Sequence, residues 1–239
     1  GQKLEDAQRN KWRKLADMLD LREGMHILEI GCGWGGFAMF AAREYGCKVT
    51  GITLSTEQLA FAKKTAEQAQ LSHLLDFQLI DYRDVRGSYD RIVSIEMFEA
   101  VGEEHWPAYF RTVRDRLRPG GVAALQIITI QDERFDLYRR QADFIQLYIF
   151  PGGMLPSPSA LKDAVTKQGL GFETARTFGL SYAETLRRWR EVFDMRWESI
   201  QPLGFDERFK RMWDYYLASC EGSFRAGSID VGQFRLTRV

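Results

Sequence analysis

The sequence predicts an α/β protein built on a doubly wound, mostly parallel sheet. Short apolar runs alternate with helix-forming segments through the first half of the chain, and this alternation implies crossovers between parallel strands. A glycine-rich turn at residues 31–36 joins the first run to the helix behind it, as in nucleotide-binding folds of this class. With 239 residues, 45% of them hydrophobic, the chain can bury the core of one such domain.

The first half supplies five strands in order. Leu4, Trp12, Leu15 and Leu19 recur at helical spacing and predict an opening helix over residues 3–20. Strands are predicted at 25–30, 48–53, 75–79, 89–95 and 122–130, with helices over 35–45 and 106–117 between them. Ser55 is a good N-cap for the helix after the second strand. A tight turn at 118–121 leads into the fifth strand.

After residue 130 the alternation gives way to helices rich in aromatic residues. Helices are predicted at 133–146, at 158–167, from a cap at Ser181 and from Asp206, and strands at 171–178 and 229–238. We expect a single domain over 1–239, with the cofactor-binding half at about 21–130. Residues 131–158 and 179–227 form a predicted substrate lid, and its aromatic helices favour a deep apolar pocket for a hydrophobic substrate.

The glycine loop predicts the cofactor. Gly31, Gly33 and Gly36 fit the G-x-G-x-x-G spacing of dinucleotide-binding loops. Glu29, two positions before the first glycine, would repel a pyrophosphate but suits a cation. The amino group and sulfonium of S-adenosylmethionine are such cations, so the loop favours a methyltransferase-type site. The alternative is an ordinary strand-to-helix turn with a capping glycine.

The next two strand ends offer further cofactor contacts. The acidic ribose partner is absent after the second strand, where Thr53 and Gln58 are the polar groups available. After the third strand, Asp81 can accept from an adenine amino group and Tyr82 can pack on the ring. A solvated turn is the alternative for Asp81.

Two acids, Glu96 and Glu99, follow the fourth strand beside Met97 and Phe98. Open parallel sheets bind ligands beyond the carboxyl ends of their strands, and acids among apolar residues are costly unless they function or are paired. We favour Glu99 for chemistry over Glu96, with an exposed loop acid as the alternative. Gln126, inside the fifth strand, is either hydrogen-bonded in the core or directed into the pocket.

Composition excludes several function classes. Lys and Arg (33) balance Asp and Glu (33), so nothing predicts nucleic-acid binding. No apolar run has the length of a transmembrane helix or the form of a signal peptide. The three cysteines have unrelated spacings, which predicts reduced thiols in an intracellular protein, and no metal site is expected. Because the chain begins at Gly1 rather than Met, we expect further residues upstream.

Several motifs together resemble the cyclopropane-fatty-acid synthase family, which includes the mycolic acid methyltransferases. They are LEIGCGWGGFA, GITLSTEQ, DYRD, DRIVSIEMFEAVG, LRPGG, YIFPGGMLPS, FGLSYAETL and RFKRMWDYYLASCEGSFR. The resemblance implies a Rossmann-like class I methyltransferase fold with a seven-stranded sheet. It also implies methylene transfer from S-adenosylmethionine to cis double bonds of phospholipid acyl chains, which forms cyclopropanes through a carbocation.

The resemblance also implies roles for individual residues. The family's base is thought to be a bound bicarbonate; Glu99 and Tyr182 match its side-chain partners and Ile128 its backbone N–H. Gln126 stands where the family commonly has His, and it can donate but cannot carry charge. The family's cysteine motif before the first helix lies outside this sequence. The implied cofactor contacts are Gly31, Gly33, Thr53, Leu54, Gln58, Tyr82, Arg83 and Ile95.

Other functions remain open at this point. A related enzyme could stop at a methylene-branched chain, or methylate a small amine. A chain without turnover could bind S-adenosylmethionine or lipid only. The resemblance implies peripheral contact with the inner membrane surface from the cytoplasm and allows a homodimer.

Overall fold

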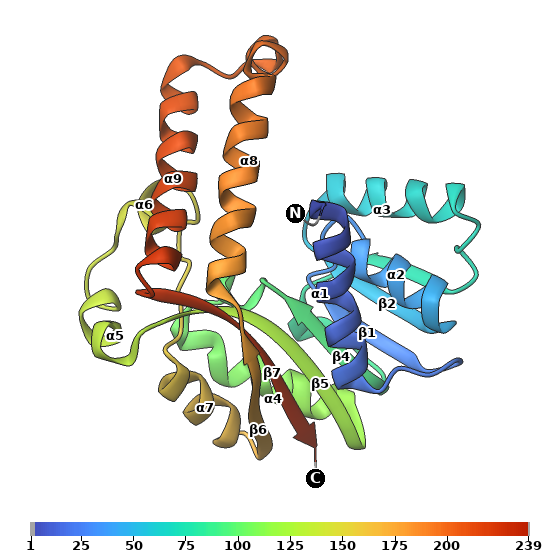
Figure 1. Cartoon of the computed structure of the whole chain (residues 1–239). Helices are drawn as coiled ribbons and strands as arrows, with labels where there is room; N and C mark the ends of the chain where they lie inside the picture. The colour runs from blue at the N-terminus through green and yellow to red at the C-terminus, as the bar shows by residue number, and fades with distance from the viewer. Residues whose placement is uncertain (1–2, 239) are drawn as a thin grey trace.

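The computed structural model describes residues 3–238 and centres on a seven-stranded sheet in the order β3-β2-β1-β4-β5-β7-β6 (Figure 1). The strands are β1 (His26–Ile30), β2 (Lys48–Thr53), β3 (Leu75–Leu79), β4 (Tyr89–Ile95), β5 (Leu117–Ile130), β6 (Leu170–Thr177) and β7 (Ile229–Arg238). Strands β1 to β5 pair in parallel, and β7 is antiparallel to both β5 and β6. The predicted mostly parallel sheet of seven strands is therefore confirmed.

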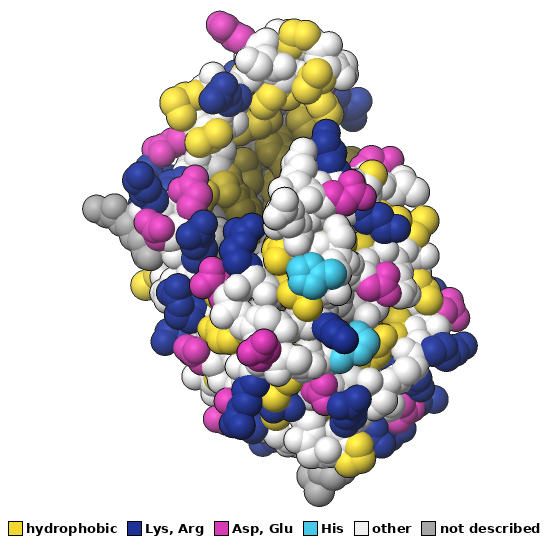
Figure 2. Space-filling model, turned by 90° about the vertical axis from the view of Figure 1, so that its right-hand side faces the viewer, with side chains coloured by type: hydrophobic (Ala, Val, Ile, Leu, Met, Phe, Trp, Pro, Cys, Tyr) yellow, Lys and Arg dark blue, Asp and Glu magenta, His cyan; other side chains and the backbone are white. Residues whose placement is uncertain are grey.

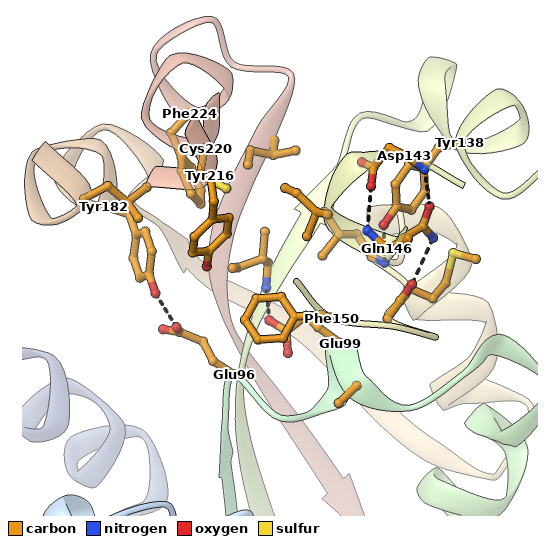
Figure 3. A pocket seen from close by; sticks show the side chains of 18 residues that line it. Glu96, Glu99, Tyr138, Asp143, Gln146, Phe150, Tyr182, Tyr216, Cys220 and Phe224 are labelled. Carbon is orange, nitrogen blue, oxygen red and sulfur yellow. Dashed lines mark hydrogen bonds between the residues drawn. The ribbon is translucent and has the colours of Figure 1, made fainter. Parts of the chain in front are cut away.

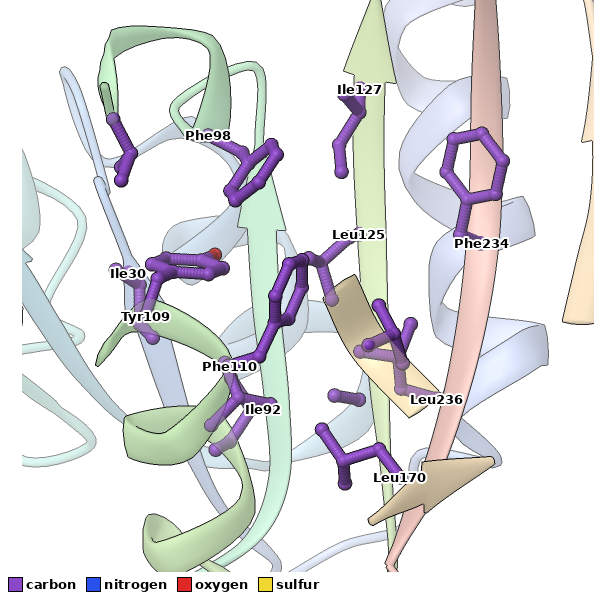
Figure 4. Close-up of a cluster of buried hydrophobic side chains, with 14 of the residues drawn as sticks. Ile30, Ile92, Phe98, Tyr109, Phe110, Leu125, Ile127, Leu170, Phe234 and Leu236 are labelled. Carbon is purple, nitrogen blue, oxygen red and sulfur yellow. The ribbon is translucent and has the colours of Figure 1, made fainter. Parts of the chain in front are cut away.

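Helices cover both faces of this sheet (Figure 1). One face carries α1 (Leu4–Leu19), α2 (Gly36–Tyr45) and α3 (Thr56–Gln68), and the other carries α4 (Trp106–Arg116), α5 (Asp132–Tyr138) and α7 (Pro158–Thr166). Short 3-10 turns lie at Tyr82–Asp84, Phe98–Ala100 and Glu103–His105. The α4 face packs Phe98, Tyr109 and Phe110 against the strands (Figure 4). These fully buried rings are among the largest side chains in the core, and they contribute to its stability through their large apolar area.

The turn predicted at 118–121 is instead part of β5, which begins at Leu117 rather than at residue 122. Leu117 pairs with Tyr89 and Val122 with Arg91, so the extra residues between them bulge out of the ladder. Gly120 has φ +72 in this bulge, a conformation that glycine adopts without strain. The glycine motif thus shifts the register of a strand instead of ending a loop.

The helix predicted over 133–146 is also wrong, because two short helices replace it, α5 and α6 (Phe144–Tyr148). Asp143 accepts from the Gln146 backbone N–H, and the Gln146 side chain accepts from the Asp143 N–H. This capping box starts a new helix. The apolar spacing alone did not reveal the restart.

Two long helices, α8 (Gly179–Ile200) and α9 (Glu207–Arg225), stand side by side above the carboxyl ends of the strands (Figure 1). Asp206 caps α9 as predicted, accepting from the Phe209 N–H. Ser181 does not cap α8, which already begins at Gly179. The Gly179 N–H is satisfied by Asp230, a residue 51 positions further along the chain, so no local cap is needed.

Hydrophobic side chains line the hollow between this helical pair and the rest of the molecule (Figure 2). Most of the exposed large hydrophobic residues lie after residue 130, among them Leu180, Val192, Met195 and Leu203. None of the helices in residues 3–238 has both the length and the apolar character needed to span a bilayer.

Candidate active site

The glycine loop between β1 and α2 is held close to the ends of β2 and β4. The Gly31 and Cys32 N–H groups both donate to Ile52 O, at 3.1 and 2.9 Å. Gly31 has φ +79, and a Cβ there would lie 2.5 Å from Met97 Cγ. Gly33 has φ +54 with open space around it. The loop therefore needs glycine at both positions, at Gly31 for space and at Gly33 for backbone conformation.

Glu29 lies buried beneath this loop, with 2% of its surface exposed. Its carboxylate accepts from the Ala38 N–H in the first turn of α2, while Oε2 has no partner. Burial raises the pKa of Glu29 to about 8. A buried acid with a free oxygen can bind the amino group of S-adenosylmethionine, so this residue fits the predicted cofactor.

The residues predicted to contact the ribose lie together at the end of β2. Thr53 is buried, and its hydroxyl donates to Gln58 Oε1 at 2.7 Å. Ser55 accepts from the Gln58 N–H, so it caps α3 as predicted. Leu54 is 72% exposed and lies at the surface next to them. This arrangement leaves the Gln58 amide nitrogen available as a donor.

At the end of β3, Asp81 binds Arg83. The Arg83 backbone N–H, Nε and Nη2 all donate to the Asp81 carboxylate at 2.8–2.9 Å, and these contacts lower the pKa of Asp81. Tyr82 packs edge-on against Tyr109 at 5.3 Å between centroids. Any contact of Asp81 with an adenine amino group would therefore be shared with Arg83. Ile95 ends β4, which β2 and β1 separate from β3 in the sheet.

Gln126 and Tyr182, two of the predicted site residues, both donate to the side chain of Glu96. Its Oε1 accepts from Gln126 Nε2 at 2.5 Å. Figure 3 shows the other bond, in which Oε2 accepts from the Tyr182 hydroxyl. The sequence favours Glu99 over Glu96 for chemistry, but it is Glu96 that has a donor on each oxygen. The left-handed backbone of Glu96, at φ +53, was not visible in the sequence.

Glu99 lies one turn further along and has different partners. Its Oε1 accepts from the Ile128 backbone N–H at 2.6 Å (Figure 3), and its buried Oε2 has no partner. Burial raises the pKa of Glu99 to about 8, and the nearby Glu96 charge acts in the same direction. At neutral pH Glu99 therefore keeps its proton.

A buried amide pair supports Gln126 from behind. Gln233 on β7 donates to Gln126 Oε1 at 3.0 Å, and both side chains are fully buried. Since the oxygen of Gln126 is occupied by this donor, its NH2 group faces Glu96. Gln126 is therefore hydrogen-bonded in the core, the first of its two predicted placements. It also contacts the pocket indirectly, because it donates to Glu96.

Glu96 and Glu99 lie at one end of a cavity of about 220 Å³ under α8 and α9 (Figure 3). Its other walls are mainly apolar and include Phe150, Met154, Leu186, Tyr216, Phe224 and Ile229. Cys220 also lines it, and burial raises the pKa of this thiol to about 12. Among residues 3–238, no group of three His, Cys, Asp or Glu is placed to hold a metal ion.

The family model for mycolic acid cyclopropane synthetase matches residues 1–234. The chain belongs to this family. Tuberculostearic acid methyltransferase UfaA1 of Mycobacterium tuberculosis is 45% identical over 98% of the chain. The cyclopropane-fatty-acyl-phospholipid synthase of Escherichia coli is 39% identical over 98%. The chain spans 55% and 59% of these two relatives.

A solved family structure agrees with the fold. Mycolic acid cyclopropane synthase CmaA1, complexed with SAH and CTAB, superposes with a TM-score of 0.90 at 30% identity, covering 99% of this chain and 86% of that one. This chain therefore has the class I S-adenosylmethionine-dependent methyltransferase fold, as its motifs predict.

Proposed function

We propose that this chain transfers a methyl group from S-adenosylmethionine to the double bond of an unsaturated lipid acyl chain. The observation that carries the proposal is the apolar cavity with Glu96 and Glu99 at one end. A small polar substrate would gain little from such walls, whereas an acyl chain fills them. Membership of a family whose named members act on lipids supports the same substrate class.

The chain's residues suit an alkene as the methyl acceptor. S-adenosylmethionine supplies an electrophilic methyl group at its sulfonium. When the alkene electron pair attacks this methyl group, the neighbouring carbon becomes a cation. Aromatic walls such as Tyr216 and Phe224 keep water away and stabilise positive charge with their ring faces. A carboxylate at the end of the cavity can then take a proton from the cation.

Two products are possible, depending on whether a hydride shift precedes the loss of the proton. Loss from the added methyl group closes a cyclopropane, the product that the motifs imply. A hydride shift before this loss leaves a methylene branch instead. The 45% identity to a relative named for tuberculostearic acid supports the branched product as the second candidate.

Bicarbonate is the base that the resemblance implies, but the residues meant to hold it are occupied. The Ile128 N–H already donates to Glu99, and Gln126 and Tyr182 already donate to Glu96. A further anion would also lie beside the Glu96 carboxylate, which repels it. The residues present therefore do not fit bicarbonate.

Membrane contact is part of the proposal, because the acyl chains of the substrate lie in a bilayer. The exposed apolar residues of α8, α9 and the turn between them provide a surface suited to that contact. Met195 and Leu203, each 74% exposed, are the clearest members of this surface.

The test uses purified protein, methyl-labelled S-adenosylmethionine and vesicles of phospholipid with monounsaturated chains. We expect label in the acyl fraction, and none with saturated chains of the same length. Resistance of the product to hydrogenation identifies cyclopropane, and hydrogen uptake identifies the methylene product. Label on a small amine, with none on unsaturated lipid, would refute the proposal.

A further inference from the structure

Glu96 occupies the position of an anion between two fixed donors. Gln126 Nε2 donates to one of its oxygens and the Tyr182 hydroxyl to the other. A carboxylate that accepts on both oxygens has the hydrogen-bonding pattern of the ionised form. Bicarbonate is planar and presents its oxygens in the same way, so Glu96 fills with a side chain the place that such an ion would take.

The surrounding contacts fix this carboxylate in place. The Glu96 backbone N–H donates to Gln126 O at 2.8 Å, so Gln126 holds both the main chain and the side chain. The left-handed conformation of Glu96 (φ +53) is unfavourable for a residue with a Cβ. Strain of this kind persists where the surroundings enforce it, commonly at functional sites.

The two neighbouring acids have different partners. Glu99 accepts from one backbone N–H and, with a pKa of about 8, remains protonated at neutral pH. Burial lowers the pKa of Lys11 on α1, and the nearby Glu96 opposes this effect only in part. A buried acid with a raised pKa and an acid that accepts from a donor on each oxygen are suited to different roles.

We propose that the Glu96 carboxylate is the base that takes the proton from the cation, in place of bicarbonate. The inference rests on the proposed function. The methyl group leaves the sulfonium, whose sulfur keeps the C–S electron pair, and bonds to one alkene carbon. An oxygen of Glu96 then takes a proton from this methyl group, and the freed C–H pair closes the ring. The proton passes to water before the next turnover.

The first experiment measures methyl transfer to monounsaturated phosphatidylglycerol vesicles in buffer freed of carbon dioxide. We expect the wild-type rate to be the same with and without added bicarbonate. Glu96→Gln should lower kcat by about 10²–10⁴-fold, the usual contribution of a positioned base. Glu104→Gln, which removes an exposed acid nearby, is the control and should keep the wild-type rate.

The second experiment supplies the missing anion. Glu96→Gly removes the carboxylate and suits the left-handed backbone, so bicarbonate should enter and restore part of the rate. Bicarbonate should also raise the Tm of Glu96→Gly but not that of the wild type, which is a readout without turnover. Failure of bicarbonate to restore any rate, with cofactor binding intact, would show that Glu96 only positions Tyr182 and would overturn the inference.

A wild-type rate that falls when bicarbonate is removed would also overturn it, and so would a Glu96→Gln variant with the wild-type kcat. These results differ from failure of the proposed function, in which the wild type transfers no methyl group to lipid under any condition.

Discussion

At the residue scale, three buried or partly buried acids lie at the ends of β1 and β4 with unequal partners. Glu29 and Glu99 each have one oxygen without a partner, and burial raises both pKa values to about 8. Glu96 has a donor on each oxygen. Burial therefore favours the protonated forms of Glu29 and Glu99, whereas Glu96 is distinguished by a hydrogen-bond donor on each oxygen.

Glu29 should couple cofactor binding to pH. The cation of S-adenosylmethionine favours the ionised carboxylate, whereas the free protein holds Glu29 protonated below about pH 8. Affinity should therefore rise with pH, up to about tenfold per unit below the pKa, and level off above it. Calorimetry from pH 6 to 9 measures this, and Glu29→Gln should bind weakly without the slope. An equal slope in the variant would assign the proton to another group.

The sequence predicted which residues gather at this site but not how they pair. Glu99, Gln126, Ile128 and Tyr182 were all expected there, because strand ends and family motifs locate them. The central position of Glu96 depends on a left-handed backbone and on Gln233, 107 residues from Gln126. Neither feature has a local sequence signal.

At the element scale, the sequence predicts correctly those strands and helix caps whose hydrogen-bond partners or apolar patterns lie close together in the chain. The strand predictions at 48–53, 75–79, 89–95 and 229–238 match the structure, since alternating or continuous apolar runs set them. Ser55 caps α3 through a bond within the same turn. Ser181 failed as a cap because Asp230, on β7, satisfies the start of α8 instead.

This contrast predicts that two similar substitutions lower the free energy of unfolding by different amounts. Ser55→Ala should lower the free energy of unfolding by about 1 kcal/mol, since it removes the oxygen that accepts from Gln58 N–H. Ser181→Ala, in the first turn of α8, should change it by less than about 0.5 kcal/mol. Urea denaturation of both variants measures the difference. Equal losses would mean that Ser181 stabilises the start of α8 after all.

At the scale of the whole molecule, the sheet with the glycine loop meets a helical pair that covers the apolar cavity. The cavity lies where these two parts join, so residues from the turn after β4 and from β5, α6, α8 and α9 all reach it (Figures 1 and 3). Most of the exposed large hydrophobic residues lie after residue 130, several of them on α8 and α9. Under the proposed function, an acyl chain would pass from a bilayer to the carboxylates along the side of the helical pair.

Charges placed on the helical pair should weaken membrane contact. Met195→Glu and Leu203→Glu should each reduce flotation with phosphatidylglycerol vesicles several-fold, because a carboxylate is costly at an apolar interface. Leu79→Glu, at the end of the edge strand β3 and also exposed, is the control and should float like the wild type. If all three variants float equally, the helical pair is not the contact surface.

Methyl transfer followed by proton loss is the central claim, and isotopic labelling tests it most directly. S-adenosylmethionine with a trideuterated methyl group is supplied with monounsaturated phospholipid, and the acyl product is weighed by mass spectrometry. The account predicts that the added carbon keeps two of its three deuterons, for either the cyclopropane or the methylene product. A product that keeps all three deuterons would show transfer without proton loss from the methyl group and would contradict the account.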